Sequence, residues 1–300
     1  MTFNYLFVVN PNAGTKSKDS IIQLIDILFD CKYNYKIIYW TNADEDIIAK
    51  IQKELSEDIK TIVVAIGGDG TVNMVSKSIE GTQHVLGIIP IGSGNGLARH
   101  LQIPMNYIKA VDFIFEKKWR IEAIDTCEVN SKSFFCTSGV GFDAHIGSLF
   151  AKNKSRGLKT YTKMVIKEFF SYKKQGYQIK LSDKTIDRSA FLITVANANQ
   201  YGNNVFISPM SKINDGLMNV VVIRKVNIFN VIPLAIRLFN KTIHKSKHVE
   251  TYLTSNLEIV RETSGAIHYD GEPTIDGENL IYSIKKKNLN VLVKRRIKSI

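Results

Sequence analysis

The sequence predicts two domains: an α/β domain built on a parallel sheet with helices on both faces, followed by a mostly antiparallel β domain. Its 300 residues are more than a single core comfortably accommodates. Up to about residue 124, candidate strands and helices alternate, as is typical of parallel sheets. After Trp119 the pattern changes to short alternating runs. We therefore expect a first domain of residues 1–124 and a second of residues 125–287.

The elements of the first domain are identified by their hydrophobic period. The expected strands are residues 3–9, 35–40, 61–66 and 84–89, and the expected helical stripes are Ile21, Ile22, Ile25 and Leu28, then Ile47, Ile48, Ile51 and Leu55. The last two strands each end in a glycine-bearing loop, at residues 67–70 and 92–96. Since ligands bind beyond the carboxyl ends of parallel strands, both loops are expected to face one crevice.

The second domain is predicted from shorter segments. Its expected strands are residues 133–137, 177–181, 191–196, 220–223, 249–253 and 257–261. Two helical stretches, residues 158–172 and 228–239, interrupt them. The second stretch contains Pro233 and Arg237 and is well short of the roughly 20 residues that span a bilayer. Any membrane contact is therefore expected to be peripheral.

The charge of the chain indicates an anionic partner. Lys and Arg number 40 against 28 Asp and Glu, a formal net charge of +12, which fits nucleic acid, a nucleotide or an acidic membrane. The cysteines, Cys31, Cys127 and Cys136, lack metal-binding spacing and are interpreted as packing residues in a reducing compartment. The first residues read as a strand and not as a signal segment. We expect a cytoplasmic protein with peripheral membrane association.

A strong local signal is the turn Gly67-Gly68-Asp69-Gly70-Thr71, which follows the third strand. Glycines let backbone N–H groups approach an anion closely, and the following helix presents its positive N-terminus. No lysine follows the last glycine, so the turn is not a Walker A loop. The pattern predicts a phosphate-binding turn, and a plain strand–turn–helix connection is the alternative.

Five segments in order resemble the diacylglycerol kinase catalytic-domain family, which includes bacterial lipid kinases and the sphingosine and ceramide kinases. They are residues 10–14 (NPNAG), 67–71 (GGDGT), 90–95 (PIGSGN), 214–217 (NDGL) and 270–273 (DGEP). The resemblance implies a lipid kinase that uses ATP and Mg²⁺. It also implies a nucleotide-binding domain completed by a returning strand within residues 288–300, a β-sandwich-like lipid-substrate domain, and an active site in the cleft between them.

The resemblance assigns the nucleotide site to the first domain. Asp69 would anchor the metal or its waters, while backbone amides of the glycine turn surround the phosphates. The residues expected to bind ATP are Asn10, Thr41, Gly67, Gly68, Asp69, Gly70, Thr71, Val72, Asn73 and Ser93. For Thr41, a helix cap before Asp44 is an equal alternative. Lys16 is either a phosphate contact or a solvated surface lysine.

Asp270 is expected to act as the general base, because it matches the family's proton acceptor and an aspartate near the γ-phosphate can orient a hydroxyl. Glu272 would point the same way if the segment is extended, and would support the metal network. With Asp69, these carboxylates form the expected catalytic set. A plain β-turn is the alternative, and a second Asp-Gly pair begins nearby at Asp276. The match to the family, and not the spacing, favours Asp270.

The turn at residues 212–217 looks like the family's Mg²⁺ site. The resemblance gives Asp215 and the backbone carbonyls of Lys212 and Leu217 as its ligands, so the charge of the lysine side chain is no objection. A tight turn between strands without a metal is the alternative.

Asp143, in the segment 138–144 after a strand, resembles a family position near the lipid head group. It is expected to bind a substrate hydroxyl or a sphingoid amine, or else to cap the next turn. Many bacterial members of the family carry Asp where this chain has Gly96, whereas sphingosine kinases resemble this chain in having a small residue there. The lipid therefore stays open between diacylglycerol, sphingosine, ceramide and others.

Basic and apolar residues crowd together in residues 152–174, which predicts an amphipathic surface for an anionic bilayer, or else a solvated helix over an ordinary core. The basic tail at residues 294–298 adds to this charge or merely solubilises the end of the chain. The histidines, including His268, lack metal-ligand spacing and are interpreted as structural or surface residues.

Two rival functions are an NAD kinase-like phosphotransferase and a non-catalytic protein that binds anionic lipid or nucleic acid. The segments 10–14 and 270–273 count against the first. Retention of both Asp69 and Asp270 counts against the second. We expect a lipid substrate at an anionic membrane surface and no nucleic acid, and leave a homodimer open.

Overall fold

The computed structural model describes residues 3–14, 18–41, 45–152, 158–224 and 226–295 of the chain, with the side chains of residues 152–162 also outside the description. Lys16 and the tail from residue 296 therefore lie outside the described residues. The chain forms two compact units, one of residues 1–126 with 286–300 and one of residues 127–285. The chain passes from the second unit back to the first along one strand, β16 (Asn279–Lys294).

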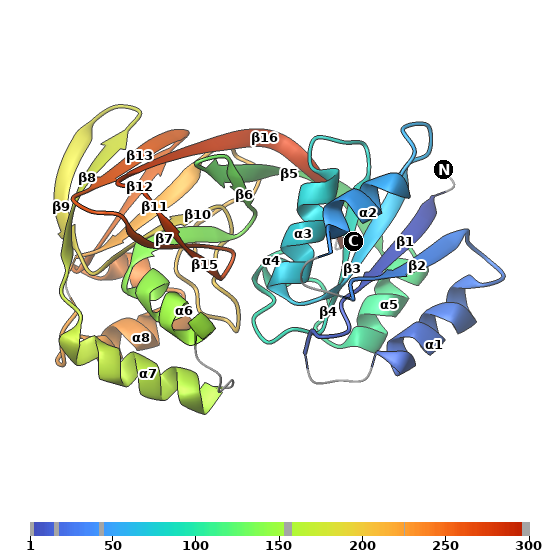
Figure 1. The fold of residues 1–300 in the computed structure, drawn as a ribbon, viewed down its shortest axis with the longest axis horizontal. Coiled ribbons are helices and arrows are strands. Elements are labelled where there is room, and N and C mark those ends of the chain that lie inside the picture. Colours follow the sequence, from blue (N-terminus) through green and yellow to red (C-terminus); the bar gives the residue numbers. More distant parts are fainter. Residues whose placement is uncertain (1–2, 15–17, 42–44, 153–157, 225, 296–300) are drawn as a thin grey trace, which may run out of the picture. The chain divides into compact units, whose positions relative to one another are not determined.

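The first unit is a mostly parallel sheet with helices on both faces, as the sequence predicts (Figure 1). The strand order is β2-β1-β3-β4-β16, and each neighbouring pair is parallel. The strands are β1 (Asn4–Val9), β2 (Tyr35–Tyr39), β3 (Thr61–Gly67), β4 (Val85–Pro90) and β5 (Trp119–Val129), which pairs with β16. The helices are α1 (Asp19–Phe29), α2 (Ile47–Lys53), α3 (Asp69–Ile79), α4 (Gly96–His100) and α5 (Tyr107–Phe115). Helices α2 and α3 pack together on one face, and α1 and α5 on the other.

The central strands show why the hydrophobic pattern predicts this sheet. Every residue of β3 and of β4 is buried, because helices cover both faces of a parallel sheet. Helix α1 buries Ile21, Ile25 and Phe29, which recur every four residues along one side. The return of β16 beside β4 places Asn290 opposite Val85.

The second unit consists of two sheets and a layer of helices. One sheet is antiparallel with the order β12-β11-β10-β7-β14-β15. The other contains β9, β8, β13 and the first part of β16, also in antiparallel pairs. The strands are β6 (Lys132–Phe134), β7 (Thr137–Gly141), β8 (Gln175–Leu181), β9 (Thr185–Ala190), β10 (Leu192–Ala196), β11 (Met218–Ile223), β12 (Val249–Thr254), β13 (Asn256–Arg261), β14 (Gly265–Tyr269) and β15 (Glu272–Asp276). The helices are α6 (Phe142–Lys152), α7 (Leu158–Ser171), α8 (Val231–Phe239) and the short 3₁₀ helix η1 (Ile243–Lys245).

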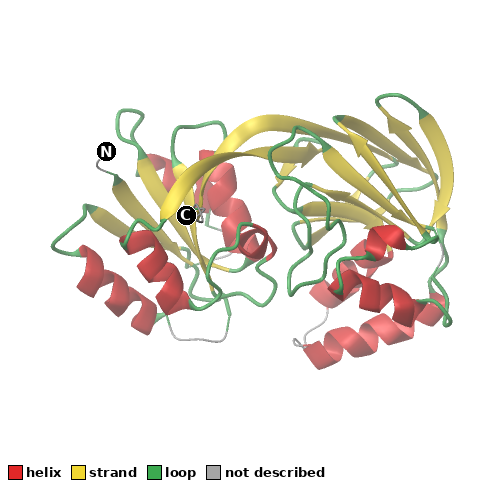
Figure 2. Ribbon diagram, turned by 180° about the vertical axis from the view of Figure 1, so that it is seen from behind, coloured by secondary structure: helices red, strands yellow, loops and turns green. Residues whose placement is uncertain are grey.

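Strand β11 separates the two cores of this unit. Val220 and Val222 belong to the cluster between the sheets, together with Ile259 of β13. Val221 and Ile223 point the other way, into a cluster with side chains from the helices. Successive residues of a strand face opposite sides, so the buried strand is apolar throughout. Helices α6, α7 and α8 cover the outer face of the six-stranded sheet (Figure 2).

Three sequence-based interpretations need correction. The expected strand 133–137 is two strands, because β6 ends at Phe134 and β7 begins at Thr137. The segment 138–144 does not follow a strand, since it is most of β7 and the first turn of α6. Cys31 is exposed, so it is not a packing residue, whereas the other two cysteines are buried. Among the described residues, none of the helices has the length and apolarity to cross a membrane.

Candidate functional site

Three predicted loops of the first unit meet at the carboxyl edge of its sheet. Asn10 follows β1, and its Nδ2 donates to Thr71 Oγ1 at 3.1 Å, at the start of α3. Gly14 lies against the loop after β4, where a Cβ would come 2.1 Å from the backbone oxygen of Ile91, and its φ of +63° also favours glycine. The two glycine loops therefore lie together, as the sequence predicts for the ends of parallel strands, and the segment 10–14 joins them.

Asp69 joins the two glycine loops to each other. Its carboxylate accepts the backbone N–H of Asn95 at 2.8 Å and of Gly96 at 2.7 Å. The loops also approach closely, because a Cβ on Gly92 would come 2.5 Å from the Cα of Gly68. Two chain segments are thus held as one surface rich in backbone amides, next to the N-terminus of α3. Such a surface favours an anion.

The residues after Gly70 that are expected to bind ATP differ in how exposed their side chains are. The side chains of Thr71, Val72 and Asn73 are buried, with exposed fractions of 2%, 6% and 3%. The Val72 N–H donates to Gly68 O at 3.0 Å and so belongs to the helix. Val72 and Asn73 therefore support the turn from inside, and Ser93 in the second loop is exposed.

Thr41 lies two residues beyond the end of β2 and does not cap α2. The cap of α2 is Asp46, whose side chain accepts Ala49 N–H at 3.0 Å. Instead, the Thr41 N–H donates to Glu45 Oε2 at 3.1 Å. The hydrogen bond from the Lys50 ammonium, with that of Thr41, holds the pKa of Glu45 below its ordinary value. The cap interpretation of Thr41 is wrong because Asp46 already fills that role.

In the second unit, Asp270 lies in the tight turn between β14 and β15. Its φ of +49° and that of Gly271, +83°, are typical of the two-residue hairpin turn that Asp-Gly favours. The segment is therefore not extended, so the expected alignment of Glu272 with Asp270 is wrong. Glu272 is exposed and begins the returning strand β15.

The Asp270 carboxylate does more than make a turn. It accepts three backbone N–H groups from the break between β6 and β7, at Phe135 (2.8 Å), Cys136 (2.7 Å) and Thr137 (3.1 Å). These donors stabilise its negative charge and fix its orientation. They also explain why the chain leaves the strand path at residues 135–136. The other Asp-Gly pair differs, since Asp276 accepts the Asn130 side chain at 3.1 Å and its own turn's Gly277 N–H at 2.8 Å.

Asp143 lies at the centre of a buried polar cluster that sequence reasoning missed. Its Oδ2 accepts from His268 Nε2 at 3.1 Å, from Tyr201 Oη at 3.0 Å and from Thr194 Oγ1 at 3.4 Å. The capping alternative also holds, since Oδ1 accepts the next backbone N–H at 2.8 Å. His268 is buried, and its Nδ1 has no hydrogen-bond partner among the described residues.

Sheet register explains how this cluster assembles. Gly139 of β7 lies opposite His268 on one side and opposite Thr194 on the other. A Cβ on Gly139 would come 3.0 Å from Asp143 Oδ2 and from His268 Nε2, so glycine leaves the space that the carboxylate fills. The available sequence signal was the presence of two glycines, Gly139 and Gly141, in one short strand, because glycine inside a strand marks a close approach.

The predicted metal turn precedes β11. Asp215 Oδ1 accepts Leu217 N–H at 3.1 Å, and Gly216 has a φ of +74°. Asp215 and Lys212 are exposed. One carboxylate and two carbonyls are oxygen donors, the class that Mg²⁺ prefers, so the donor set fits the ion. No group of three or more His, Cys, Asp or Glu that could hold a metal occurs among the described residues.

Arg261, a buried residue that the sequence did not single out, anchors the hairpin that carries His268 and Asp270. Its guanidinium donates to the carbonyls of Gly265 (2.9 Å) and Asp276 (2.8 Å), at the open end of the β14–β15 hairpin. Burial lowers the pKa of Arg261. Backbone carbonyls carry no sequence signal, so this anchor was not predictable.

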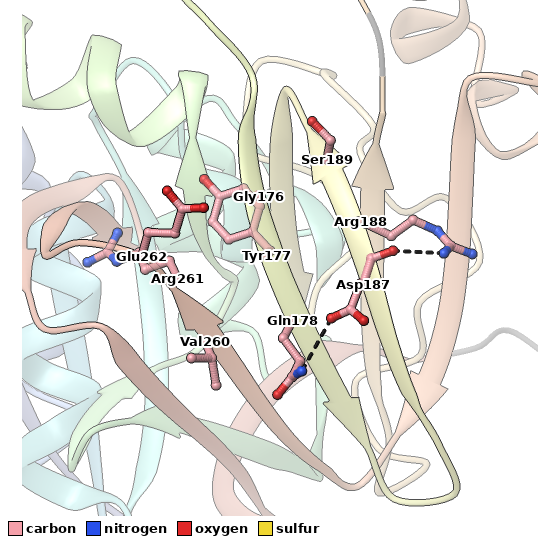
Figure 3. Close-up of a pocket in the computed structure, with 9 residues that line it drawn as sticks. All are labelled: Gly176, Tyr177, Gln178, Asp187, Arg188, Ser189, Val260, Arg261 and Glu262. Atoms are coloured by element: carbon pink, nitrogen blue, oxygen red, sulfur yellow. Dashed lines mark hydrogen bonds between the residues drawn. The ribbon is translucent and has the colours of Figure 1, made fainter.

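A hollow of about 530 Å³ lies on β8, β9 and β13, away from the predicted site residues (Figure 3). Its lining residues are Gly176, Tyr177, Gln178, Asp187, Arg188, Ser189, Val260, Arg261 and Glu262. Gln178 and Asp187 bridge neighbouring strands across it at 3.3 Å. It contains none of the residues expected to bind ATP, metal or lipid.

Comparison with known proteins agrees with the geometry of both units. Residues 4–129 match the family model "Diacylglycerol kinase catalytic domain", and residues 137–293 match "YegS C-terminal NAD kinase beta sandwich-like domain". A "Probable lipid kinase YegS-like" protein of Chromohalobacter salexigens is 25% identical over 79% of this chain and 76% of its own length. The "Diacylglycerol kinase" of Bacillus subtilis is 24% identical over 88% of both chains.

A solved structure supports the fold over nearly the whole chain. It is a crystal structure of a diacylglycerol kinase from Bacillus anthracis, with a TM-score of 0.75 and 17% identity over 96% of each chain. The matched catalytic domain implies kinase activity and the use of ATP. The chain therefore belongs to the diacylglycerol kinase catalytic-domain family, in its YegS-like lipid kinase branch.

Proposed function

We propose that the chain transfers the γ-phosphoryl group of ATP to a hydroxyl of a membrane lipid of the diacylglycerol or sphingoid type. The observation that carries the proposal is the pair of glycine loops joined by Asp69, within the part of the chain that matches a kinase catalytic domain. Phosphoryl transfer depends mainly on positioning and charge neutralisation, which an amide-rich edge of a parallel sheet supplies.

The acceptor hydroxyl is proposed to bind at Asp270. Three amide donors stabilise the charge of this carboxylate and fix its orientation. The hydroxyl proton passes to Asp270 while the hydroxyl oxygen bonds to the γ-phosphorus and the bond to the leaving ADP breaks. Because three backbone amides fix its position, Asp270 also orients the hydroxyl for attack.

Mg²⁺ is proposed as the cation of the reaction. Within the first unit, Asp69 would anchor the ion or its waters. Within the second unit, the turn at Lys212, Asp215 and Leu217 offers a separate set of oxygen donors, as the resemblance implies. When bound, the ion neutralises phosphate charge.

Asp143 and its partners are proposed to bind the polar part of the lipid. His268 and Asp270 lie two residues apart on the same hairpin, so a hydroxyl or amine near Asp143 would lie in the same region of the unit as the proposed base. The Bacillus subtilis relative is a diacylglycerol kinase by name, which makes diacylglycerol the first acceptor to test. We place the reaction in the cytoplasm at an anionic membrane surface, without nucleic acid.

The test is incubation of the purified chain with γ-labelled ATP, Mg²⁺ and separate detergent micelles of diacylglycerol, sphingosine, ceramide and monoacylglycerol, with NAD⁺ as a water-soluble acceptor. We expect label in one of the lipids. Label in NAD⁺ alone would identify an NAD kinase-like enzyme, and label in no acceptor would contradict the proposal.

A further inference from the structure

Helix α8 of the second unit exposes an apolar stripe. Phe229, Ile232, Ile236 and Phe239 follow one another at spacings of three and four residues, which places them on one side of a helix and its preceding turn. Their exposed fractions are 87%, 66%, 54% and 57%. Large exposed apolar patches mark interaction sites.

The same helix also faces the core. Leu234 is buried, and Leu238 packs against the same cluster as Val221 and Ile223 of β11. A helix that is apolar on two sides is typical of one covered by protein or by lipid. The helix is only nine residues long, too short to span a bilayer.

The turn before α8 holds Phe229 in place. Asn227 Oδ1 accepts the N–H groups of Phe229 and Asn230, both at 3.1 Å, and Asn230 Oδ1 accepts Asn227 N–H at 2.7 Å. These paired side chains close the turn. The strongly exposed phenyl ring is therefore presented by an ordered backbone.

Positive charge lies along one side of α8, beside this stripe. Residues 216–249 contain six Lys and Arg and no Asp or Glu. A hollow of about 380 Å³ lies against α8, and a second of about 380 Å³ adjoins it through a shared histidine. The cations that line them are Arg237, Lys245, Lys247 and His248 in the first, and Lys174, Arg188, Arg224 and His248 in the second. His248 counts as a cation only when protonated. Two acidic groups moderate the second hollow: Asp187 in its lining and Glu250, which pairs with Arg188 and Arg224.

We infer that α8 and the turn before it form the surface by which the protein docks on an anionic phospholipid bilayer. The apolar stripe enters the acyl boundary while the cations at its edge contact lipid phosphates. The inference rests on the proposed function in one respect, since a lipid kinase must reach a substrate that lies in a bilayer. This surface differs from the one that the sequence predicts, which is the basic and apolar segment of residues 152–174.

Two other occupants fit less well. A symmetric dimer through this face would bring two strongly basic surfaces together, and like charges across an interface are unfavourable. Nucleic acid would satisfy the charge but would leave Ile232 and Ile236 without an apolar partner. An anionic bilayer satisfies both the charge and the apolar stripe.

The test is co-sedimentation of the full chain with vesicles of phosphatidylcholine that contain phosphatidylglycerol, compared with pure phosphatidylcholine vesicles. We expect Phe229→Ser with Ile232→Ser to weaken binding to the anionic vesicles at least about tenfold. Lys245→Gln with Lys247→Gln should weaken it about fivefold per charge and reduce its dependence on salt. The control Ile27→Ser removes an isoleucine that is 79% exposed on α1 and should bind like the wild type.

Phe170→Ser tests whether α7, and not α8, binds the vesicles, because the Phe170 ring is 69% exposed on α7. If Phe170→Ser loses vesicle binding while the α8 variants bind like the wild type, the inference is overturned. Equal binding to neutral vesicles, or a wild-type dimer that the α8 variant abolishes without changing vesicle binding, would overturn it too. Phe229→Trp provides a gain of signal that does not depend on a loss of binding, since its emission should shift to the blue only with anionic vesicles.

The inference and the proposed function fail separately. An α8 variant that loses vesicle binding but still phosphorylates lipid in detergent micelles supports the docking surface. A wild-type protein that binds anionic vesicles through α8 but phosphorylates no lipid contradicts the proposed function and leaves the docking surface standing.

Discussion

The two units hold their most important aspartates by the same device in different settings. Asp69 accepts two backbone N–H groups from the neighbouring glycine loop. Asp270 accepts three from residues 135–137, at the break between β6 and β7. In both, a charged side chain ties together segments distant in sequence, because amide donors stabilise a carboxylate at short range.

The settings differ in what the backbone is free to do. In the first unit, the glycines bring two loops into contact, and Gly92 has no room for a side chain beside Gly68. In the second unit, the turn at Asp270 projects from the hairpin, and a Cβ on Gly271 or Gly277 would meet nothing within 4 Å. The glycine loops of the first unit therefore depend on close backbone approach, as do Gly139 and Gly141 of β7, whereas the turns at Gly271 and Gly277 do not.

The largest effect is expected from Asp270→Asn. An amide cannot accept the hydroxyl proton and turns a donor toward the backbone N–H groups, so turnover should fall by about 10²–10⁴-fold. ATP binding, measured by calorimetry, should survive because the glycine loops belong to the other unit. Asp276→Asn, in the second Asp-Gly turn, is the matched control and should stay active. An active Asp270→Asn enzyme would mean that another group accepts the proton.

Asp69→Ala should weaken ATP binding, in contrast to Asp270→Asn. Removal of its carboxylate leaves the amides of Asn95 and Gly96 without that partner, and hydrogen bonds to a charged group contribute about 1.5–3 kcal/mol each. ATP affinity should fall at least about tenfold in calorimetry. Asp58→Ala removes an exposed carboxylate from the same unit and should leave affinity unchanged. Unchanged ATP affinity in Asp69→Ala would show that the loops keep their arrangement without it.

A pair of glycine substitutions tests the contrast directly. In Gly92→Ala the new Cβ would lie 2.5 Å from Gly68 Cα, so backbone must shift. Forced overpacking costs about 1–3 kcal/mol, which should appear as a lower melting temperature and weaker ATP binding. Gly277→Ala meets nothing within 4 Å and should melt like the wild type. Equal melting of both variants would remove the distinction between the glycine loops and the open turn at Gly277.

The smallest effect concerns Glu250, which pairs with Arg188 at 2.8 Å and Arg224 at 3.0 Å. Partial burial alone would raise the pKa of Glu250, but hydrogen bonds from Tyr252 and Arg188 and the charges of both arginines outweigh it and lower the pKa from its ordinary 4.5. A carboxyl whose pKa is lower in the folded than in the unfolded chain stabilises the fold at any pH above its ordinary pKa. That stability is lost as the pH falls through the lowered pKa.

Because the pair is partly exposed, Glu250→Gln should cost at most about 1 kcal/mol at neutral pH. The difference from the wild type in urea unfolding should shrink below about pH 4, where the wild-type carboxylate also becomes protonated. A difference that grows toward low pH would mean that the sign of the coupling is opposite.

Much of the first unit could be predicted from the sequence, because its signals are local. The strand at residues 61–66 and the turn that follows it appear as an uninterrupted apolar run and a glycine cluster. The contact between Asp69 and the second loop was not predictable, since it joins residues 26 and 27 positions apart. The second unit was predicted as a class, but the break at residues 135–136 depends on Asp270.

The sequence by itself determined the order of strands and helices, the glycine turns, the excess of positive charge and the resemblance to a kinase family. Those features depend on hydrophobic period and on residues that are neighbours in the chain. Only the tertiary structure decided that Asp143 meets His268, because the register of β7 and β14 and the missing side chain of Gly139 bring them together. It also decided that one apolar side of α8 stays exposed, since a helical pattern does not say which of two apolar sides packs on a core.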